Sequence, residues 1–400
     1  MKKFSFLFVL LSVFISSYAE DRLIVDNTQI VSGESAYIVV KMDFDENHDY
    51  VSYQFNVELP SGISLIEETS GQASFVLPSN QPTNVFKITD FPMSNGILKV
   101  ASNPSTVIAD HEGTLVYIPV EAEAGLTKED VLNGKLTNVV FAHKNATTEK
   151  LADVNFTITI ADQVVLDENS EIAPLATSGN VNVKVKRTIK ANSWSTICLP
   201  FEMDEEQVKD VFGDDVKLKT FKSYDIETSG NDVTKITINF EDADLSEDGF
   251  ESNRPYLIKV SQQVNEFSLK GVDIEPDDVE DTSEKGENTK KKDGSFIGTY
   301  CANTTIPEND LFISNNKFYY SKGLTKIRAF RAYFSQKHVL ANLEDAGARI
   351  NIIDGDATRV KNLTSALSEN EEIWYDLLGQ KIENLKKGMY ITNNKKVIIK

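Results

Sequence analysis

Four oxygen-donor side chains alternate along a short acidic stretch, and together they could bind a calcium ion. The four donors are Asp43, Asp45, Asn47 and Asp49. Alternate donors are typical of the start of an EF-hand calcium loop, which also needs a glycine at its sixth position and a glutamate at its twelfth. Here those positions hold His48 and Gln54. These departures favour an acidic hairpin tip between two strands, so we expect no cofactor, and a weak extracellular Ca²⁺ site is the alternative.

Two cysteines, Cys198 and Cys301, are the only thiols in the chain. They are too few for a disulfide scaffold and lack zinc-ligand spacing. In an oxidising compartment they could form one disulfide. The alternative is two separate buried thiols, because the sequence does not give the Cα separation that a bridge requires.

Short catalytic motifs are missing from the chain. It contains no Gly-x-Ser-x-Gly elbow, His-Glu-x-x-His pair, phosphate-binding loop or dinucleotide fingerprint. Its four histidines lie in four separate regions of the sequence. We therefore expect no enzyme activity. The alternative from another class is a polysaccharide-acting hydrolase with a carboxylate pair that no motif marks.

Aromatic rings on a sheet surface could hold a ligand such as a sugar. Tyr37 and Tyr117 each stand between aliphatic neighbours, so their rings should face away from the core. These two tyrosines are our candidate ligand-binding residues. Tyr53, Phe55 and Trp194 are instead predicted to pack in the core, as most large apolar side chains do.

Alternation of apolar and polar residues dominates the chain and predicts the elements that position these side chains. The clearest segments are 36–44, 51–59, 154–160 and 181–185. Because side chains alternate across a strand, each segment predicts a strand with one buried face and one solvated face. Tyr319 and Tyr320 should accordingly lie on opposite faces of one strand. We predict an all-β protein.

Helical signals are confined to two short segments. Asp204 can cap a helix that Gly213 ends, with apolar residues on one face between them. A second, shorter helical segment is predicted at 127–134.

Turn signals and composition divide the chain into parts. Residues 21–162 carry about nine strand candidates and predict an N-terminal jelly-roll β-sandwich. Residues 163–179 lose the alternation and predict a linker. A second β-rich domain is expected at 180–354, with a highly charged segment, 272–294, predicted as a mobile loop. Residues 373–400 predict a small C-terminal β-meander.

The N-terminus has the pattern of a secretory signal peptide. Lysines precede an apolar run at 4–15, and Ser17 and Ala19 are small residues suited to signal-peptidase cleavage. We predict a signal peptide at 1–19, cleaved after Ala19. The protein should then be extracellular or at the outer-membrane surface, with the periplasm as the alternative. No segment reaches the roughly 20 apolar residues of a spanning helix, so we expect no insertion into a lipid bilayer.

The charge balance narrows the range of partners. The chain has 61 acidic and 41 basic residues, a net charge of −20. Nucleic-acid binding draws its affinity from clustered Lys and Arg, so we expect no nucleic-acid partner.

Four motifs of the N-terminal part occur in the order of a known family. They are QIVSGES at 29–35, YQFNVELP at 53–60, GILKVA at 96–101 and GTLVYIPV at 113–120. In these motifs the segment resembles the cohesin family, relatives of several carbohydrate-binding modules. The resemblance implies a nine-stranded jelly roll that binds a protein or carbohydrate partner through a sheet face and carries no catalytic residues.

Five further motifs lie in the second domain. They are WSTICLPF at 194–201, NRPYLIKV at 253–260, GSFIGTY at 294–300, FYYS at 318–321 and AFRAYF at 329–334. The domain is similar to a module common in secreted proteins of the Bacteroidetes. This resemblance implies no particular activity.

The tail carries YDLLGQK at 375–381 and KGMYI at 387–391. It resembles the C-terminal half of type IX secretion sorting domains, which implies outer-membrane export and attachment. The N-terminal half of such a domain, with its Asn-Pro-Ala stretch, is missing. A plain terminal β-meander is therefore the alternative.

The sequence as a whole predicts a non-catalytic secreted or cell-surface binding protein. Its ligand would be a glycan or a protein partner held by the cohesin-like domain. The alternatives are the hydrolase named above and a purely structural stalk or assembly subunit.

Overall fold

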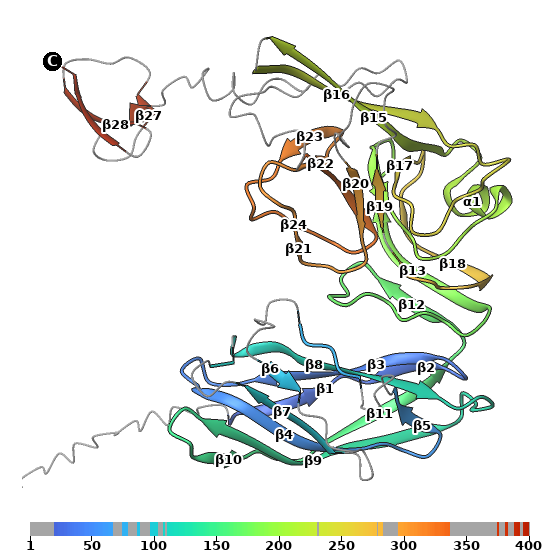
Figure 1. Ribbon diagram of the computed structural model, residues 1–400, viewed down its shortest axis with the longest axis vertical. Coiled ribbons are helices and arrows are strands. Elements are labelled where there is room, and N and C mark those ends of the chain that lie inside the picture. Colours follow the sequence, from blue (N-terminus) through green and yellow to red (C-terminus); the bar gives the residue numbers. More distant parts are fainter. Residues whose placement is uncertain are drawn as a thin grey trace, which may run out of the picture. The chain divides into compact units, whose positions relative to one another are not determined.

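A computed structural model describes most of the chain. The described residues are 20–66, 74–78, 86–88, 97–102, 107–108, 110–229, 232–277, 279–282 and 295–336, with four short strands between 374 and 399. Strands make up nearly all of the regular structure, and the described part holds one α-helix (Figure 1). The all-β prediction is confirmed. Contacts divide the chain into two compact units, unit 1 (Met1–Val165 and Leu175–Val183) and unit 2 (Leu166–Pro174 and Lys184–Lys400).

Unit 1 is a sandwich of two sheets (Figure 1). The smaller sheet has the order β1 (Arg22–Val25), β3 (Ser35–Asp43), β8 (Glu112–Ala122), β5 (Ile63–Leu65). The larger has the order β2 (Thr28–Val31), β11 (Val154–Ala161), β9 (Val131–His143), β4 (Tyr50–Glu58), β7 (Ile97–Ser102), β6 (Phe86–Ile88), and β10 (Thr148–Lys150) also pairs with β9. The β2–β11 pair is parallel. The predicted N-terminal β-sandwich is therefore confirmed.

Alternate residues of facing strands form the core of this sandwich. In β4 the side chains of Tyr53, Phe55 and Val57 are at most 3% exposed, whereas Gln54 and Asn56 between them are partly exposed. This is the pattern expected of a strand with one face on the core. Burying each large apolar side chain contributes roughly 1.5–3 kcal/mol. The alternation in the sequence thus fixes which face of the sheet turns outward.

The helix predicted at 127–134 is a turn followed by a strand. Asp130 Oδ2 accepts hydrogen bonds from Thr127 N and Oγ1 at 2.7 and 3.0 Å, and Asp130 N donates to Thr127 O at 3.0 Å. Strand β9 then begins at Val131 and pairs with β11. The pairing of β9 with β11 therefore outweighs the weak helical preference of this short segment.

The segment predicted as a linker, 163–179, contains folded structure. Its β12 (Val164–Asp167) pairs with β13 (Val181–Ile189), which pairs in turn with β18 (Val264–Val272). The following residue, Glu168, is only 4% exposed. Two of the three boundaries between the units fall inside this segment, at 165/166 and 174/175, and the third lies beyond it at 183/184.

Unit 2 adds two larger sheets and a two-stranded one. One has the order β14 (Ser195–Ile197), β17 (Tyr256–Lys259), β15 (Lys217–Ser229), β16 (Asp232–Asp242). The other, called here the C-sheet, has the order β19 (Glu280–Thr282), β20 (Ser295–Thr299), β25 (Arg331–Ser335), β22 (Leu311–Ser314), β23 (Lys317–Tyr320). The short pair is β21 (Thr304–Thr305) and β24 (Lys326–Ile327). Aromatic residues from both larger sheets share one core, in which the rings of Phe296 and Phe334 stack 4.3 Å apart.

The helix α1 (Glu205–Phe212) lies where the sequence predicts it. Asp204 Oδ1 accepts from Gln207 N at 2.7 Å, and the Gln207 side chain accepts from Asp204 N at 3.0 Å. This reciprocal capping box satisfies two backbone donors at the helix start. Gly213 ends the helix with a φ of 95°, and Val208 and Phe212 are buried.

The segment predicted as a mobile loop, 272–294, is folded at its start. Val272 and Ile274 are 5% and 0% exposed, and β19 forms at 280–282. Two buried aliphatic side chains are enough to fix the start of this segment. Residues 283–294 lie outside the described part of the chain.

The tail contains four strands, β26 (Trp374–Tyr375), β27 (Lys381–Ile382), β28 (Gly388–Thr392) and β29 (Lys395–Ile399). They form an antiparallel sheet in the order β27-β26-β28-β29. This agrees with the small C-terminal β structure predicted from the sequence. The predicted signal peptide, 1–19, lies outside the described residues, and none of the described helices is long and apolar enough to span a bilayer.

Candidate binding surfaces

The four candidate calcium donors do not converge on one point. Asp43 Oδ2 accepts from the guanidinium of Arg22 at 2.7 and 2.9 Å. Asp45 Oδ1 instead accepts from Asn47 N at 2.9 Å and Asn47 Nδ2 at 3.2 Å. Within the described residues, no group of three or more His, Cys, Asp or Glu side chains could hold a metal ion. The stretch is also not a hairpin tip, because β3 and β4 belong to different sheets.

Asp49, the fourth donor, belongs to a polar cluster that the sequence does not predict. His143 Nδ1 lies 2.6 Å from Asp49 Oδ1, and His143 Nε2 lies 3.3 Å from Glu149 Oε2. The Tyr50 hydroxyl lies 2.6 Å from Asp21 Oδ2 and 2.8 Å from Glu149 Oε2. Burial first, and then these two carboxylates, raise the pKa of Tyr50 far above its ordinary value. The cluster ties the start of unit 1 to β4, β9 and β10, and no local motif marks it because its members are far apart in sequence.

The two candidate tyrosines lie together on the outer side of the smaller sheet. Their rings are 5.9 Å apart and meet edge to face at 67°. Tyr117 is nevertheless only 4% exposed, and Val76 forms an antiparallel bridge with its backbone. Tyr37 is partly exposed. Both rings lie on the predicted face of the sheet. Tyr117 is nevertheless wrong as a ligand-binding candidate, because its buried ring offers no open platform.

The outer side of the larger sheet of unit 1 carries hydroxyl and amide groups beside apolar side chains such as Val131, which is 64% exposed, and Val140, which pairs with Gln54. This polar face consists of Ser52, Gln54, Asn56, Asn133, Thr137, Asn155, Thr157 and Thr159. Cross-strand register places Asn56 opposite Thr137 and Asn133 opposite Thr157. All eight side chains are exposed or partly exposed.

One charged row crosses the polar face. Glu58 pairs in register with Lys135, so the two opposite charges are neighbours. Glu58 Oε1 accepts from Thr137 Oγ1 at 2.8 Å, and Lys135 Nζ lies 3.0 Å from Asp153 Oδ2. The polar face therefore carries little net charge in a strongly acidic chain. Its hydroxyl and amide groups can both donate hydrogen bonds to a flat partner and accept them from it.

In unit 2, the aromatic residue Trp194 packs in the core as predicted. Its side chain is 7% exposed, its backbone N donates to Asn316 Oδ1 at 2.6 Å, and Lys259 Nζ lies 5.8 Å from its ring centre. Trp194 is therefore a core residue and not a ligand platform.

The two cysteines are separate free thiols, so the alternative of a disulfide is not realised in the structure. Cys198 is fully buried, with its Sγ 3.9 Å from the Tyr300 hydroxyl. Burial raises the pKa of Cys198 to about 12, and burial also raises the pKa of Cys301. Because the thiolate is the reactive form, Cys198 is not suited to act as a nucleophile.

In the described part of unit 2, three arginines surround one buried glutamate. Glu168 accepts from Arg187 at 3.3 Å, from Arg328 at 2.8 Å and from Arg331 at 2.6 Å. The Arg187 side chain is fully buried and also donates to the backbone oxygen of Thr196. Burial by itself raises the pKa of Glu168, but the arginines, Arg331 foremost, outweigh it and hold that pKa below its ordinary value. The cluster anchors Leu166–Pro174 within unit 2.

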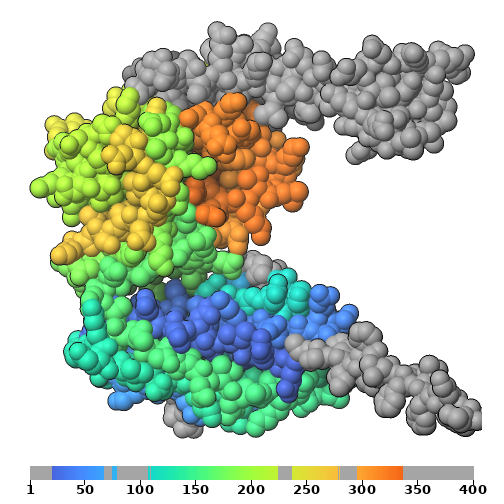
Figure 2. All heavy atoms as spheres, turned by 180° about the vertical axis from the view of Figure 1, so that it is seen from behind, coloured from blue at the N-terminus to red at the C-terminus, as the bar shows by residue number. Residues whose placement is uncertain are grey.

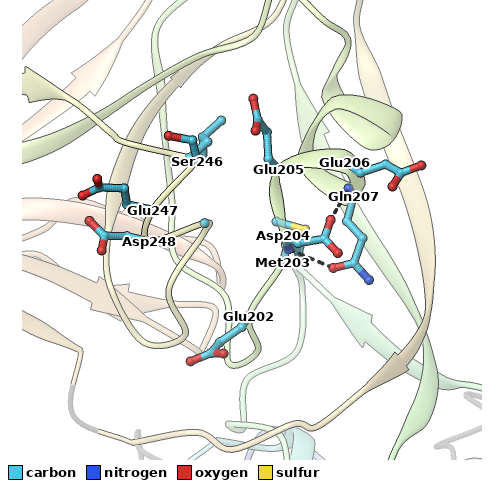
Figure 3. Close-up of a pocket in the computed structure, with 11 residues that line it drawn as sticks. Glu202, Met203, Asp204, Glu205, Glu206, Gln207, Ser246, Glu247 and Asp248 are labelled. Atoms are coloured by element: carbon cyan, nitrogen blue, oxygen red, sulfur yellow. Dashed lines mark hydrogen bonds between the residues drawn. The ribbon is translucent and has the colours of Figure 1, made fainter.

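An open pocket of about 640 Å³ lies between the start of α1 and residues 245–249 (Figure 3). Six carboxylates line it: Glu202, Asp204, Glu205, Glu206, Glu247 and Asp248. Five of them are exposed, Glu205 is partly exposed, and Asp204 caps the helix. A glycosidase acid needs an enclosing apolar environment that keeps it protonated. The hydrolase alternative requires two carboxyl groups about 5–10 Å apart in a cleft, and the exposed carboxylates of this pocket do not by themselves identify such a pair.

Comparison with known proteins finds similarity among solved structures. No family model and no curated protein matches the chain. The sixth cohesin of scaffoldin B from Acetivibrio cellulolyticus, solved with a Cel5 dockerin mutant, is 17% identical, with 35% of this chain and 99% of that chain covered and a TM-score of 0.30. A non-cellulosomal cohesin from Archaeoglobus fulgidus is 15% identical over 36% of this chain and 92% of that chain, with a TM-score of 0.28. A cohesin module of a family 33 glycoside hydrolase from Clostridium perfringens is 11% identical over 35% and 98%, also with a TM-score of 0.28. Each of these alignments covers about a third of this chain.

Proposed function

We propose that this protein is a non-catalytic binding protein that holds a protein partner on the polar face of unit 1. The observation that carries the proposal is the contrast between the two outer surfaces of the sandwich. On the smaller sheet, Tyr117 and Pro119 are buried although they point away from the core. On the larger sheet, the polar face keeps its eight hydroxyl and amide side chains at least partly exposed.

The composition of the polar face favours a protein over a glycan at this surface. Non-obligate protein interfaces are about as polar as the rest of a protein surface and carry roughly one hydrogen bond per 100–200 Å². Sugars commonly stack on an aromatic ring, and the outward side chains of β4, β9 and β11 include none. A glycan therefore remains the second candidate ligand of unit 1.

Export of the protein is part of the same proposal. The signal-peptide pattern at 1–19 and the tail at 373–400 support a secreted or outer-membrane-surface protein of a Bacteroidetes bacterium, with the periplasm as the alternative. A partner outside the cytoplasm also fits the strong acidity of the chain, because a net charge far from zero keeps an exported protein soluble. The resemblance of the tail to part of a type IX sorting domain supports surface attachment.

Site-specific photo-crosslinking tests this proposal. A benzoylphenylalanine at Gln54 on the polar face should yield a discrete adduct with one protein in extracts of the producing cells or their environment. The matched control is the same probe at Glu46, an exposed residue of the β3–β4 connection. Mass spectrometry of the adduct identifies the partner, and titration of the two purified proteins must reproduce the complex.

Two results would contradict the proposal. Equal adducts from both probe positions would show that the polar face has no special partner. No adduct, together with self-association in light scattering and silence on a glycan array, would leave the structural stalk or assembly subunit as the better account.

A further inference from the structure

A row of large apolar side chains crosses the outer side of the C-sheet in unit 2. Phe312 of β22 pairs with Tyr319 of β23, and their rings stack 5.7 Å apart at 26°. On the other side, Tyr333 of β25 pairs with Ile297 of β20. The pairing of Leu311 with Phe334 brings β22 and β25 together, and the antiparallel register then places Phe312 next to Tyr333. We call Ile297, Tyr333, Phe312 and Tyr319 the aromatic row; Figure 2 shows the atoms of this part of the chain in orange.

These four residues are not part of the core beneath the sheet. The residues that alternate with them, including Phe296, Phe334 and Phe318, form the buried core cluster. Because side chains alternate across a strand, the aromatic row points to the opposite side of the sheet. All four of its members are partly exposed, whereas Ser295, Thr299 and Ser335 on the same side of β20 and β25 are buried. Three rings in one registered row are unusual for a surface that only has to meet water.

The geometry of the row suits an extended ligand with flat rings. Neighbouring strands lie about 4.8 Å apart, so four strands in register give a row roughly 15 Å long. The row itself carries no charge. Exposed polar side chains lie beside it in the next register position, where Ser314 of β22 pairs with Lys317 of β23. The surface therefore combines ring faces in the centre with hydrogen-bonding groups at the margin.

Several other kinds of ligand fit this surface poorly. Single-stranded nucleic acid stacks on aromatic side chains, but it also needs a basic groove for its phosphates, and the chain has a net charge of −20. A peptide that extends a sheet pairs with a strand edge, here that of β23, the last strand of the C-sheet, and would not cover Tyr333 and Phe312 on the inner strands β25 and β22. A neutral sugar chain meets the requirements, because each pyranose ring has an apolar C–H face and hydroxyl groups around its rim.

We propose that the aromatic row is a binding site for a neutral polysaccharide in an extended conformation. Tyr319 and Phe312 stack against successive sugar rings, while the margin at Ser314 and Lys317 hydrogen bonds to their hydroxyl groups. The site lies in unit 2 and is independent of the polar face of unit 1. The molecule would then hold a protein with one unit and a glycan with the other.

Affinity electrophoresis of the full chain tests this site. The gels contain soluble neutral polysaccharides (xylan, mannan or β-glucan) or the acidic polysaccharide pectin. We expect at least one neutral polysaccharide to retard the wild type and pectin to have no effect. Tyr319→Ala should weaken the apparent affinity about tenfold, which corresponds to the loss of a contact worth about 1.4 kcal/mol. Phe312→Ala should act in the same direction.

Two matched variants separate loss of binding from loss of folding. Leu324→Ala removes an apolar side chain that is 86% exposed between β23 and β24 of the same unit and is not a member of the row, and it should bind like the wild type. Tyr319→Leu keeps apolar bulk without a ring and should bind as weakly as Tyr319→Ala while melting close to the wild-type Tm.

Retardation by no neutral polysaccharide, or by pectin alone, would overturn the proposal. So would a Tyr319→Ala protein that migrates like the wild type in every gel. If Tyr319→Ala instead abolished self-association in light scattering, the row would be an interface between copies and the glycan site would be wrong. Crosslinking from Gln54 should not change in any of these variants, so failure of this site and failure of the proposed function remain distinguishable.

Discussion

Glu168 explains why a segment with the composition of a linker is folded. Its three arginine partners stand 19, 160 and 163 residues further along the chain. Residues 163–179 lack alternation and carry acids, Ser and Pro174, and this local pattern does not indicate that arginines from β13 and the β25 region contact one carboxylate. Long-range charge pairing of this kind cannot be predicted from a single sequence.

Replacing Glu168 should destabilise unit 2 strongly. In Glu168→Gln, the fully buried Arg187 loses its counter-charge, and breaking a buried pair in this way costs about 3–5 kcal/mol. Urea unfolding followed by Trp194 fluorescence, in a Trp374→Phe background, measures the change. The control is Arg328→Ala, which should cost less than about 1 kcal/mol because that side chain is 58% exposed. Equal effects of the two substitutions would show that burial does not govern the cluster.

The difference in stability between the wild type and Glu168→Gln should depend on pH. The arginines hold the native pKa of Glu168 below its ordinary value of 4.5, so the unfolded state binds this proton first as the pH falls. The stability that the carboxylate contributes is fully present above about pH 4.5 and is lost as the pH falls through the lowered native pKa. The stability difference between wild type and Glu168→Gln should therefore shrink towards pH 3. A difference that grows on acidification would contradict the assigned role.

At the scale of elements, the sequence predicts the strands and the direction of their side chains well, but not which of the outward side chains other segments cover. The wet faces of β4 and β11 follow directly from alternation, and so do the core positions of Tyr53 and Phe55. The capping box of α1 is also local and was predictable. Tyr117 shows what alternation cannot predict, because its ring has the expected direction yet is buried and its backbone is bridged by Val76, which is distant in sequence.

Close packing between β9 and β11 should make Gly134 intolerant of a side chain. A Cβ added at Gly134 would lie 2.3 Å from Cζ of Phe156. Overpacking of this kind typically costs about 1–3 kcal/mol, so Gly134→Ala should lower the free energy of unfolding of unit 1 by about that amount. Gly179→Ala is the matched control, since nothing lies within 4 Å of its added Cβ.

A double-mutant cycle checks the cause of this effect. Phe156→Leu shortens the clashing side chain, so the pair of changes should cost less than the sum of the two single changes by at least about 0.5 kcal/mol. Strict additivity would mean that Gly134 is needed for its backbone and not for the ring of Phe156.

At the scale of the whole molecule, the sequence predicts the fold class and the approximate extent of the sandwich, but not its surfaces. The polar face depends on β4 pairing with β9, strands that are more than 70 residues apart in the chain. The aromatic row likewise depends on strand order in the C-sheet, although Tyr319 was already expected on the face opposite Tyr320. The two binding surfaces that we propose thus differ in chemistry, one offering hydroxyl and amide groups and the other aromatic rings.

The tail gives a prediction about where the protein resides. If residues 373–400 direct surface attachment, their deletion should leave the protein in the periplasm while the remaining chain stays folded. Cell fractionation and protease accessibility of intact cells measure this. The control is the deletion variant with the tail of an established surface protein added back. Surface exposure that persists without any tail would show that these residues are only a terminal β-sheet.

The central claim is that unit 1 binds its partner through the polar face. It is tested most directly by the dissociation constant of the crosslinked partner for variants of that face. Gln54→Lys and Thr157→Lys each place a long charged side chain on this otherwise nearly neutral surface, and Glu46→Lys makes an equally drastic change on an exposed connection away from it. We predict that both face variants bind at least tenfold more weakly, a change of about 1.4 kcal/mol, and that Glu46→Lys binds like the wild type. Unchanged affinity in both face variants, with Glu46→Lys equally unaffected, would contradict the claim that unit 1 binds its partner through the polar face.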